Sequence, residues 1–161
     1  MIEVRDKNEA LYLACEMEKR AVDMYERAQI LFIGTSLAPM IEELIADERR
    51  HLDTFGKMWE EGAALSAERK LLLAAHAGEM LFSGGLMQAK REGAFDDPLA
   101  LLRYAYDWET DATRRYEAYA ALYAADEGVS TVFRTIAGEE RVHQTELTDH
   151  INKLEMNQSP E

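Results

Sequence analysis

The sequence contains very little cysteine: Cys15 stands alone among 161 residues. A single cysteine excludes a disulfide within the chain, and it excludes the Cys-x-x-Cys pairs that hold four-cysteine iron or zinc sites. The chain also begins with a charged segment that lacks the apolar stretch of a secretory signal. Both features predict a protein of a reducing compartment, and we expect a cytoplasmic location.

Basic residues are scarce relative to acidic ones, with 18 Lys and Arg against 31 Asp and Glu and a formal net charge of -13. Nucleic-acid surfaces need clustered positive charge, so we expect no nucleic-acid partner. No apolar run approaches the ~18 residues of a membrane-spanning helix, so we expect no membrane partner. The hydrophobic content of 47% is that of a folded protein, and the length fits a single domain over residues 1–161.

Only three prolines and nine glycines interrupt the chain. Gly34 is expected to end a first long helix. Ser36 is expected to cap a second helix, which has Pro39 in its first turn and runs to Gly62. No segment shows the two-residue alternation of a strand, so the predicted fold class is all-α.

The later part of the chain carries the start signals of two more long helices. Asp97 followed by Pro98 predicts the start of a third helix, which is expected to run to about Ala125. Ser130 is expected to cap the fourth long helix.

A long connection separates the two pairs of helices. It covers roughly residues 62–97 and contains a shorter helix over residues 67–82, which is expected to end at Gly84-Gly85. The chain is therefore predicted to form a four-helix bundle, with two helical hairpins joined by a long crossover that contains a short helix.

An internal repeat places chemically active residues on the predicted core. Steps of three and four residues follow the side of a helix that faces a bundle core. In the first helix these steps read Leu11, Ala14, Glu18, Ala21 and Tyr25. In the third they read Leu102, Ala105, Glu109, Ala112 and Tyr116, with the same residue types at a constant offset of 91.

The second and fourth helices repeat in the same way, at an offset of 92. The second reads Ile41, Leu44, Glu48, His51 and Phe55, and the fourth reads Phe133, Ile136, Glu140, His143 and Leu147. Each core-facing row is apolar except near its middle, where it carries Glu, or Glu followed one turn later by His. All six polar side chains are therefore predicted to point inward at a similar depth.

Four buried carboxylates would each cost several kcal/mol if they were ionised and unpaired. Two divalent cations would balance their charge, and the six side chains provide suitable oxygen and nitrogen donors. One Glu-x-x-His motif alone is ordinary surface sequence in a chain this rich in Glu. Two copies in register with duplicated Glu-bearing helices instead predict a metal site. His76 and His150 have Leu73 and Leu147 three residues earlier, so both are interpreted as non-ligands.

Four stretches with this pattern resemble the ferritin-like di-iron carboxylate proteins, and most closely the rubrerythrin-like branch. They are Ala14 to Tyr25, Glu42 to Phe55, Asp107 to Tyr116 and Glu139 to Leu147. The resemblance implies a ferritin-like bundle that holds two iron ions per subunit. It also implies an oxidoreductase that reduces hydrogen peroxide or dioxygen with electrons from a separate donor protein.

In this interpretation Glu18 and Glu109 are terminal metal ligands, Glu48 and Glu140 bridge the two metals, and His51 and His143 supply nitrogen. Tyr25 and Tyr116 are candidates to hydrogen-bond ligands from outside, with ordinary core packing as the alternative.

Two departures separate the chain from typical rubrerythrins. With a single cysteine, we expect no rubredoxin-like domain within these residues, and Ala112 stands where rubrerythrins carry an additional carboxylate. That carboxylate is implicated in the redox-linked movement of one iron in rubrerythrins, so its absence counts against a rubrerythrin-like peroxidase activity. The alternatives are non-catalytic metal binding in iron handling, storage or sensing, and a bundle occupied by zinc or manganese. A homodimer is expected from the long crossover and an exposed apolar stretch, Leu71-Leu72-Leu73.

Overall fold

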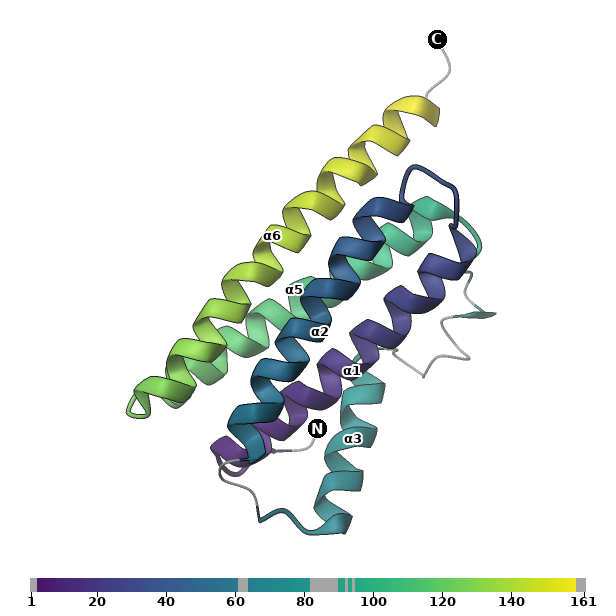
Figure 1. Cartoon of the computed structure of the whole chain (residues 1–161). Helices are drawn as coiled ribbons and strands as arrows, with labels where there is room; N and C mark the ends of the chain where they lie inside the picture. The colour runs from purple at the N-terminus through teal and green to yellow at the C-terminus, as the bar shows by residue number, and fades with distance from the viewer. Residues whose placement is uncertain (1–2, 61–63, 82–89, 92, 94, 159–161) are drawn as a thin grey trace.

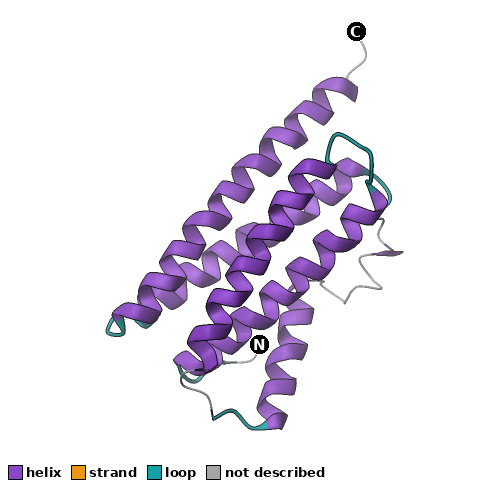
Figure 2. Ribbon diagram, viewed as in Figure 1, coloured by secondary structure: helices purple, strands orange, loops and turns teal. Residues whose placement is uncertain are grey.

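The computed structural model describes residues 3–60, 64–81, 90–91, 93 and 95–158. Its elements are α1 (Lys7–Leu31), α2 (Ala38–Glu60), α3 (Ala67–Leu81), α5 (Pro98–Leu122) and α6 (Glu127–Gln158). The described residues contain helices, turns and loops but no strand (Figure 2). The predicted all-α class is therefore confirmed.

The long helices form two hairpins, α1 with α2 and α5 with α6, packed side by side (Figure 1). Helices α1 and α6 run in one direction, and α2 and α5 run in the other (Figure 1). The long crossover allows this order, and α3 within it packs along α1. The expected helix ends at Gly62 and Gly84-Gly85 lie outside the described residues.

Several helix ends follow directly from local sequence. The Asp6 side chain caps α1 by accepting hydrogen bonds from the amides of Asn8 and Glu9. The turn after α1 contains Gly34 at a φ of 76°, a left-handed conformation that glycine adopts without steric cost. The Asp97 side chain accepts from the Ala100 amide at 2.8 Å and caps α5, as predicted.

The start of α6 differs from the prediction. Helix α5 ends at Leu122, and α6 already begins at Glu127. The Asp126 side chain accepts from the Val129 amide, so Asp126 acts as the cap and the expectation for Ser130 was wrong. Ser130 is buried inside α6, and its hydroxyl donates to the Ala120 carbonyl at 2.8 Å. It therefore ties the first turn of α6 to the end of α5.

The start of α2 differs in a smaller way, because the helix begins at Ala38, two residues after the expected cap Ser36. The hydroxyl of Thr35 donates to the Phe32 carbonyl at 2.7 Å and accepts from the Leu37 amide at 3.3 Å. A hydroxyl one residue earlier than expected therefore stabilises the turn.

Helix α3 is fixed to α1 by a bidentate ion pair and by apolar packing. Both Glu9 carboxylate oxygens accept from the Arg69 guanidinium at 2.6 Å. Leu73 is fully buried, whereas Leu71 and Leu72 are 72% and 45% exposed. The expected exposed stretch Leu71-Leu72-Leu73 is therefore wrong at Leu73, because successive residues of a helix face different directions.

The core between the hairpins is apolar along its length and aromatic toward one end. Rings of Phe55, Tyr116, Tyr119 and Phe133 pack with centroids 5.1–5.8 Å apart. No described helix combines the length and apolarity that crossing a membrane requires. The polar residues of the repeat lie within this otherwise apolar core.

Candidate metal centre

The structure places all six predicted ligand side chains inside the bundle. Each of the four long helices contributes, and no member of the set is more than 2% exposed. The members are Glu18 of α1, Glu48 and His51 of α2, Glu109 of α5, and Glu140 and His143 of α6. They converge because each lies on the core-facing row of its helix, at the same level once the chain has turned back.

The donor atoms form two overlapping groups. Glu18, Glu48, His51 and Glu140 offer one ligand atom each within 4.8 Å of one another. Glu48, Glu109, Glu140 and His143 form the second group under the same limit. Glu48 and Glu140 belong to both groups, so they lie where bridging carboxylates would lie, and each group adds its own glutamate and histidine. The ring centroids of His51 and His143 are 5.8 Å apart.

Burial strongly perturbs the titration of the carboxyl groups. Removal from water, with the nearby charge of Glu48, raises the pKa of the Glu18 and Glu109 carboxyls well above the usual range. Burial acts on Glu48 in the same direction. Interactions with Glu18 and the two imidazoles outweigh it, and the pKa of Glu48 lies below its usual range.

The two imidazoles respond in the opposite sense. Burial disfavours their charged form, but the surrounding carboxylates outweigh it: Glu140 and Glu48 raise the pKa of His51 to about 10. Glu109, Glu140 and Glu48 likewise raise the pKa of His143. The shifts of Glu18, Glu109 and the two imidazoles all favour the protonated forms, which lowers the negative charge of the cluster, as bound cations also would.

Four buried polar atoms of the cluster lack a hydrogen-bond partner within the described part of the chain. They are Glu48 Oε1, His51 Nδ1, Glu109 Oε2 and Glu140 Oε1. Such atoms are rare in folded proteins, because an unpaired buried polar atom costs about 1–3 kcal/mol. His51 Nδ1 lies 3.2 Å from Glu140 Oε1, so two of the unpaired atoms face one another. The donors and their charge therefore fit two divalent cations.

Two tyrosines hold the outer glutamates from the opposite hairpin. The Tyr25 hydroxyl on α1 donates to Glu109 Oε1 on α5 at 2.5 Å. The Tyr116 hydroxyl on α5 donates in return to Glu18 Oε1 on α1. The second oxygen of each glutamate is thereby left to face the cluster, which is the orientation of a ligand that binds through one oxygen. Both hydroxyls are thus positioned to orient the glutamates, as well as packing in the core.

Two further carboxylates, which the core-facing rows do not include, contact the outer nitrogens of the imidazoles. His51 Nε2 lies 2.6 Å from Glu139 Oε2, and His143 Nε2 lies 3.3 Å from Asp47 Oδ2. Each pair crosses between α2 and α6. Asp47 and Glu139 each precede a cluster glutamate and are related by the same offset of 92. The repeat therefore contained the signal that would have found them.

Comparison with known proteins agrees with this geometry. Residues 100–161 match the family model described as Rubrerythrin. This match supports a relationship to the ferritin-like di-iron carboxylate superfamily. The match covers α6 and all but the first two residues of α5, and the internal repeat extends the same pattern to α1 and α2. Searches of the curated proteins and of the solved structures gave no match.

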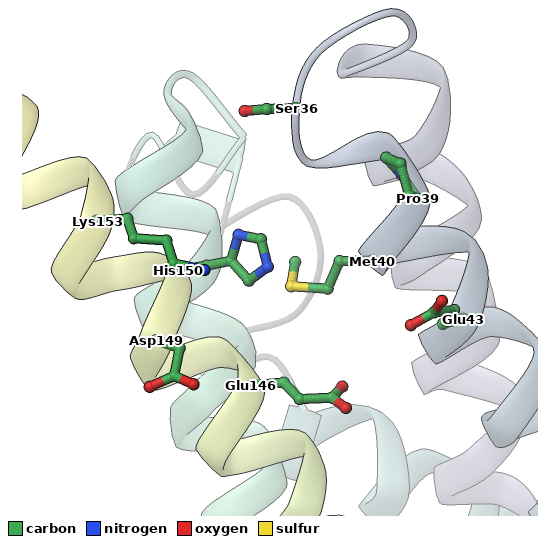
Figure 3. A pocket seen from close by; sticks show the side chains of 8 residues that line it. All are labelled: Ser36, Pro39, Met40, Glu43, Glu146, Asp149, His150 and Lys153. Carbon is green, nitrogen blue, oxygen red and sulfur yellow. The ribbon is translucent and has the colours of Figure 1, made fainter.

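The other two histidines lie outside both donor groups. His76 is buried on α3, where burial and the charge of Arg115 lower its pKa. His150 lines a hollow of about 300 Å³ between α2 and α6 (Figure 3). The other residues that line it are Ser36, Pro39, Met40, Glu43, Glu146, Asp149 and Lys153. No cluster residue is among them, so the ferritin-like site is separate from this hollow.

Proposed function

We propose that the chain binds two iron ions in the six-residue cluster and reduces hydrogen peroxide or dioxygen with electrons from a separate donor protein. The observation that supports the proposal is the pair of overlapping donor groups that share Glu48 and Glu140 in a buried core. A ferrous pair, when bound, supplies two electrons for cleavage of an O–O bond. The chain itself supplies position, charge balance and exclusion of water.

Each residue has a distinct role in this proposal. Glu48 and Glu140 would bridge the two metal positions, because they alone belong to both donor groups. Glu18 and Glu109 would be terminal oxygen ligands. His51 and His143 present Nδ1 to the cluster and turn Nε2 toward an outer carboxylate.

The tyrosines and the apolar core complete the site. Tyr25 and Tyr116 orient the terminal glutamates, and neither ring is more than 1% exposed, so the hydroxyls are shielded from water. Removal from bulk water strengthens every electrostatic interaction within the cluster.

The test begins with anaerobic iron loading and an iron count per chain. Peroxide is then added while the visible absorption of ferric iron is followed, and a reductant is added to return the iron to the ferrous state. We expect two iron ions per chain, oxidation within seconds and repeated cycles. A His143→Gln variant should lose iron, whereas His150→Gln, which changes the same residue type two turns along α6, should keep it. If the chain binds two iron ions and neither peroxide nor dioxygen oxidises them, the oxidoreductase proposal is contradicted.

The second candidate is metal binding without turnover, in iron handling, storage or sensing. Ala112, where rubrerythrins carry an additional carboxylate, is buried, and its repeat equivalent Ala21 is also a buried alanine. Neither half of the cluster therefore has the extra ligand, and this symmetry favours metal positions that do not move. Zinc or manganese would also fit the same donors. Elemental analysis of the native protein separates the metals, and size-exclusion mass separates a homodimer from a storage shell.

A further inference from the structure

Arg50 on α2 joins the outer carboxylates of both histidines. Its guanidinium donates to Glu139 Oε2 at 2.8 Å through Nη2, and it contacts Asp47 Oδ1 through Nη1. Glu139 contacts His51, and Asp47 contacts His143. One exposed arginine is therefore two contacts away from each of the two buried imidazoles.

This link breaks the twofold repeat of the site. The cluster residues, the tyrosines and the outer carboxylates all occur as pairs, at an offset of 91 or 92. The repeat equivalent of Arg50 is Val142, whose side chain is apolar and 55% exposed. A single arginine thus serves both halves.

We propose that Arg50 is a positioning residue that holds Asp47 and Glu139 against the imidazoles and thereby couples the two metal positions. The inference rests on the proposed metal site. It concerns the coupling of the two halves and is independent of the reaction that the site performs.

The chemistry of histidine ligation explains why such a residue is useful. An imidazole that binds a metal through Nδ1 must carry its proton on Nε2, and an outer carboxylate that accepts from Nε2 stabilises this tautomer. Asp47 and Glu139 are partly exposed, with side chains 35% and 38% accessible, so water competes for their oxygens. The planar guanidinium can contact two carboxylates at once, whereas a lysine ammonium on its flexible stem cannot do so in a fixed geometry.

Binding of Co(II), followed by its visible absorption against a competing chelator, tests the inference. The variants are Arg50→Val, Arg50→Lys and the exchange Arg50→Val/Val142→Arg. The control is Arg49→Val, which removes the same charge one residue away, where Arg49 pairs with Glu26. Far-ultraviolet circular dichroism checks that each variant keeps its helices.

The two possible roles of Arg50 predict opposite changes in Co(II) affinity when it is replaced. If Arg50 acted only through its charge, its removal would tighten the binding of a cation. If it positions both imidazoles, Arg50→Val should weaken Co(II) binding at both positions, by about 10–100-fold as for other outer partners of metal ligands. Arg49→Val should leave the affinity near that of the wild type, and Arg50→Lys should be intermediate.

The exchange variant gives the sharpest result. Arg50 has Asp47 three residues earlier on α2 and Glu139 opposite on α6. An arginine at position 142 would have Glu139 three residues earlier on α6 and Asp47 opposite on α2, which is the reverse of the present arrangement. Arg50→Val/Val142→Arg should therefore recover most of the lost affinity. In Zn(II)-loaded protein, nitrogen-15 NMR should show faster exchange of the ring N–H protons of His51 and His143 in Arg50→Val than in Arg49→Val, which controls for a general loosening of the fold.

The outcomes separate this inference from the proposed function. If the wild type binds two Co(II) ions and Arg50→Val binds them as tightly as Arg49→Val, the coupling is refuted and the metal site stands. The coupling is also refuted if Arg50→Val/Val142→Arg folds but does not recover Co(II) affinity. An equal loss of affinity in Arg50→Val and Arg49→Val refutes it as well. If the wild type binds no Co(II), the proposed metal site fails and the inference fails with it.

Discussion

Replacing Tyr25 or Tyr116 by phenylalanine removes one hydroxyl and keeps the aromatic ring in the core. Each hydroxyl donates to a glutamate of the opposite hairpin, and Glu109 Oε2 already lacks a partner among the described residues. Tyr25→Phe therefore leaves Glu109 with a second unpaired oxygen, and Tyr116→Phe removes the hydroxyl partner of Glu18 Oε1, both inside the buried core. Loss of a buried partner of this kind costs about 1–3 kcal/mol.

Thermal unfolding of the metal-free protein measures this cost. For a chain of this size, 1 kcal/mol corresponds to about 2–4 °C in Tm. Because the tyrosines are repeat equivalents with reciprocal partners, the two variants should fall by similar amounts. Each should also weaken metal binding by about tenfold, the lower end for a lost outer partner. Tyr123→Phe, at a partly buried tyrosine that packs against Tyr119, is the control for loss of a hydroxyl elsewhere.

A double-mutant cycle isolates the interaction itself. In a Glu109→Leu background, Tyr25→Phe should cost nothing or stabilise the protein, because the hydroxyl no longer has its acceptor. An equal loss of stability from Tyr25→Phe in the wild-type and Glu109→Leu backgrounds would refute the assigned hydrogen bond. So would a loss in Tyr25→Phe no larger than that in Tyr123→Phe.

Three further expectations concern charge and metal loading. Glu18, Glu109 and His51 have raised pKa values, and each must lose its proton to bind a metal. Metal affinity should therefore rise with pH, and binding should release protons. Calorimetry in buffers of different ionisation enthalpy measures this proton release. Affinity independent of pH between about 6 and 8 would contradict those shifts. Loading with Fe(II) at ~100 times its Kd should stabilise the fold by about 2.7 kcal/mol per site, and a chelator should reverse the rise in Tm. Glu9→Gln should destabilise the docking of α3 by about 1–3 kcal/mol. The Arg69 ion pair lowers the pKa of Glu9, so its contribution to stability is present above the ordinary carboxyl pKa and is lost as pH falls through the lowered pKa. If the stability of the wild type and of Glu9→Gln fell in parallel as the pH was lowered, the pairing would be contradicted.

Much of the site could be predicted because helical periodicity is a local property. Steps of three and four residues determine which side chains share a face, whatever the helix packs against. The repeat at offsets of 91 and 92 then identified Glu18 with Glu109 and His51 with His143 as equivalent positions. The capping of α5 by Asp97 was predictable for the same reason, since a cap involves only neighbouring residues.

Other features depended on how the helices pack, and no local pattern specified them. The sequence placed Tyr25 on the core row, but only the packed hairpins decide that its hydroxyl meets Glu109 of α5 and not a group of its own hairpin. Ser130 has the composition of a cap, but it became a link to Ala120 because α6 begins earlier, at the Asp126 cap.

The sequence alone determined the number and type of the long helices, their inward faces and the six side chains they carry, because these follow from spacing along one chain. The tertiary structure decided which carboxylate contacts which imidazole, and that one arginine reaches both Asp47 and Glu139. Those contacts cross between α2 and α6, so they depend on the angle and register of two hairpins that are far apart in sequence. Periodicity within one helix specifies neither quantity.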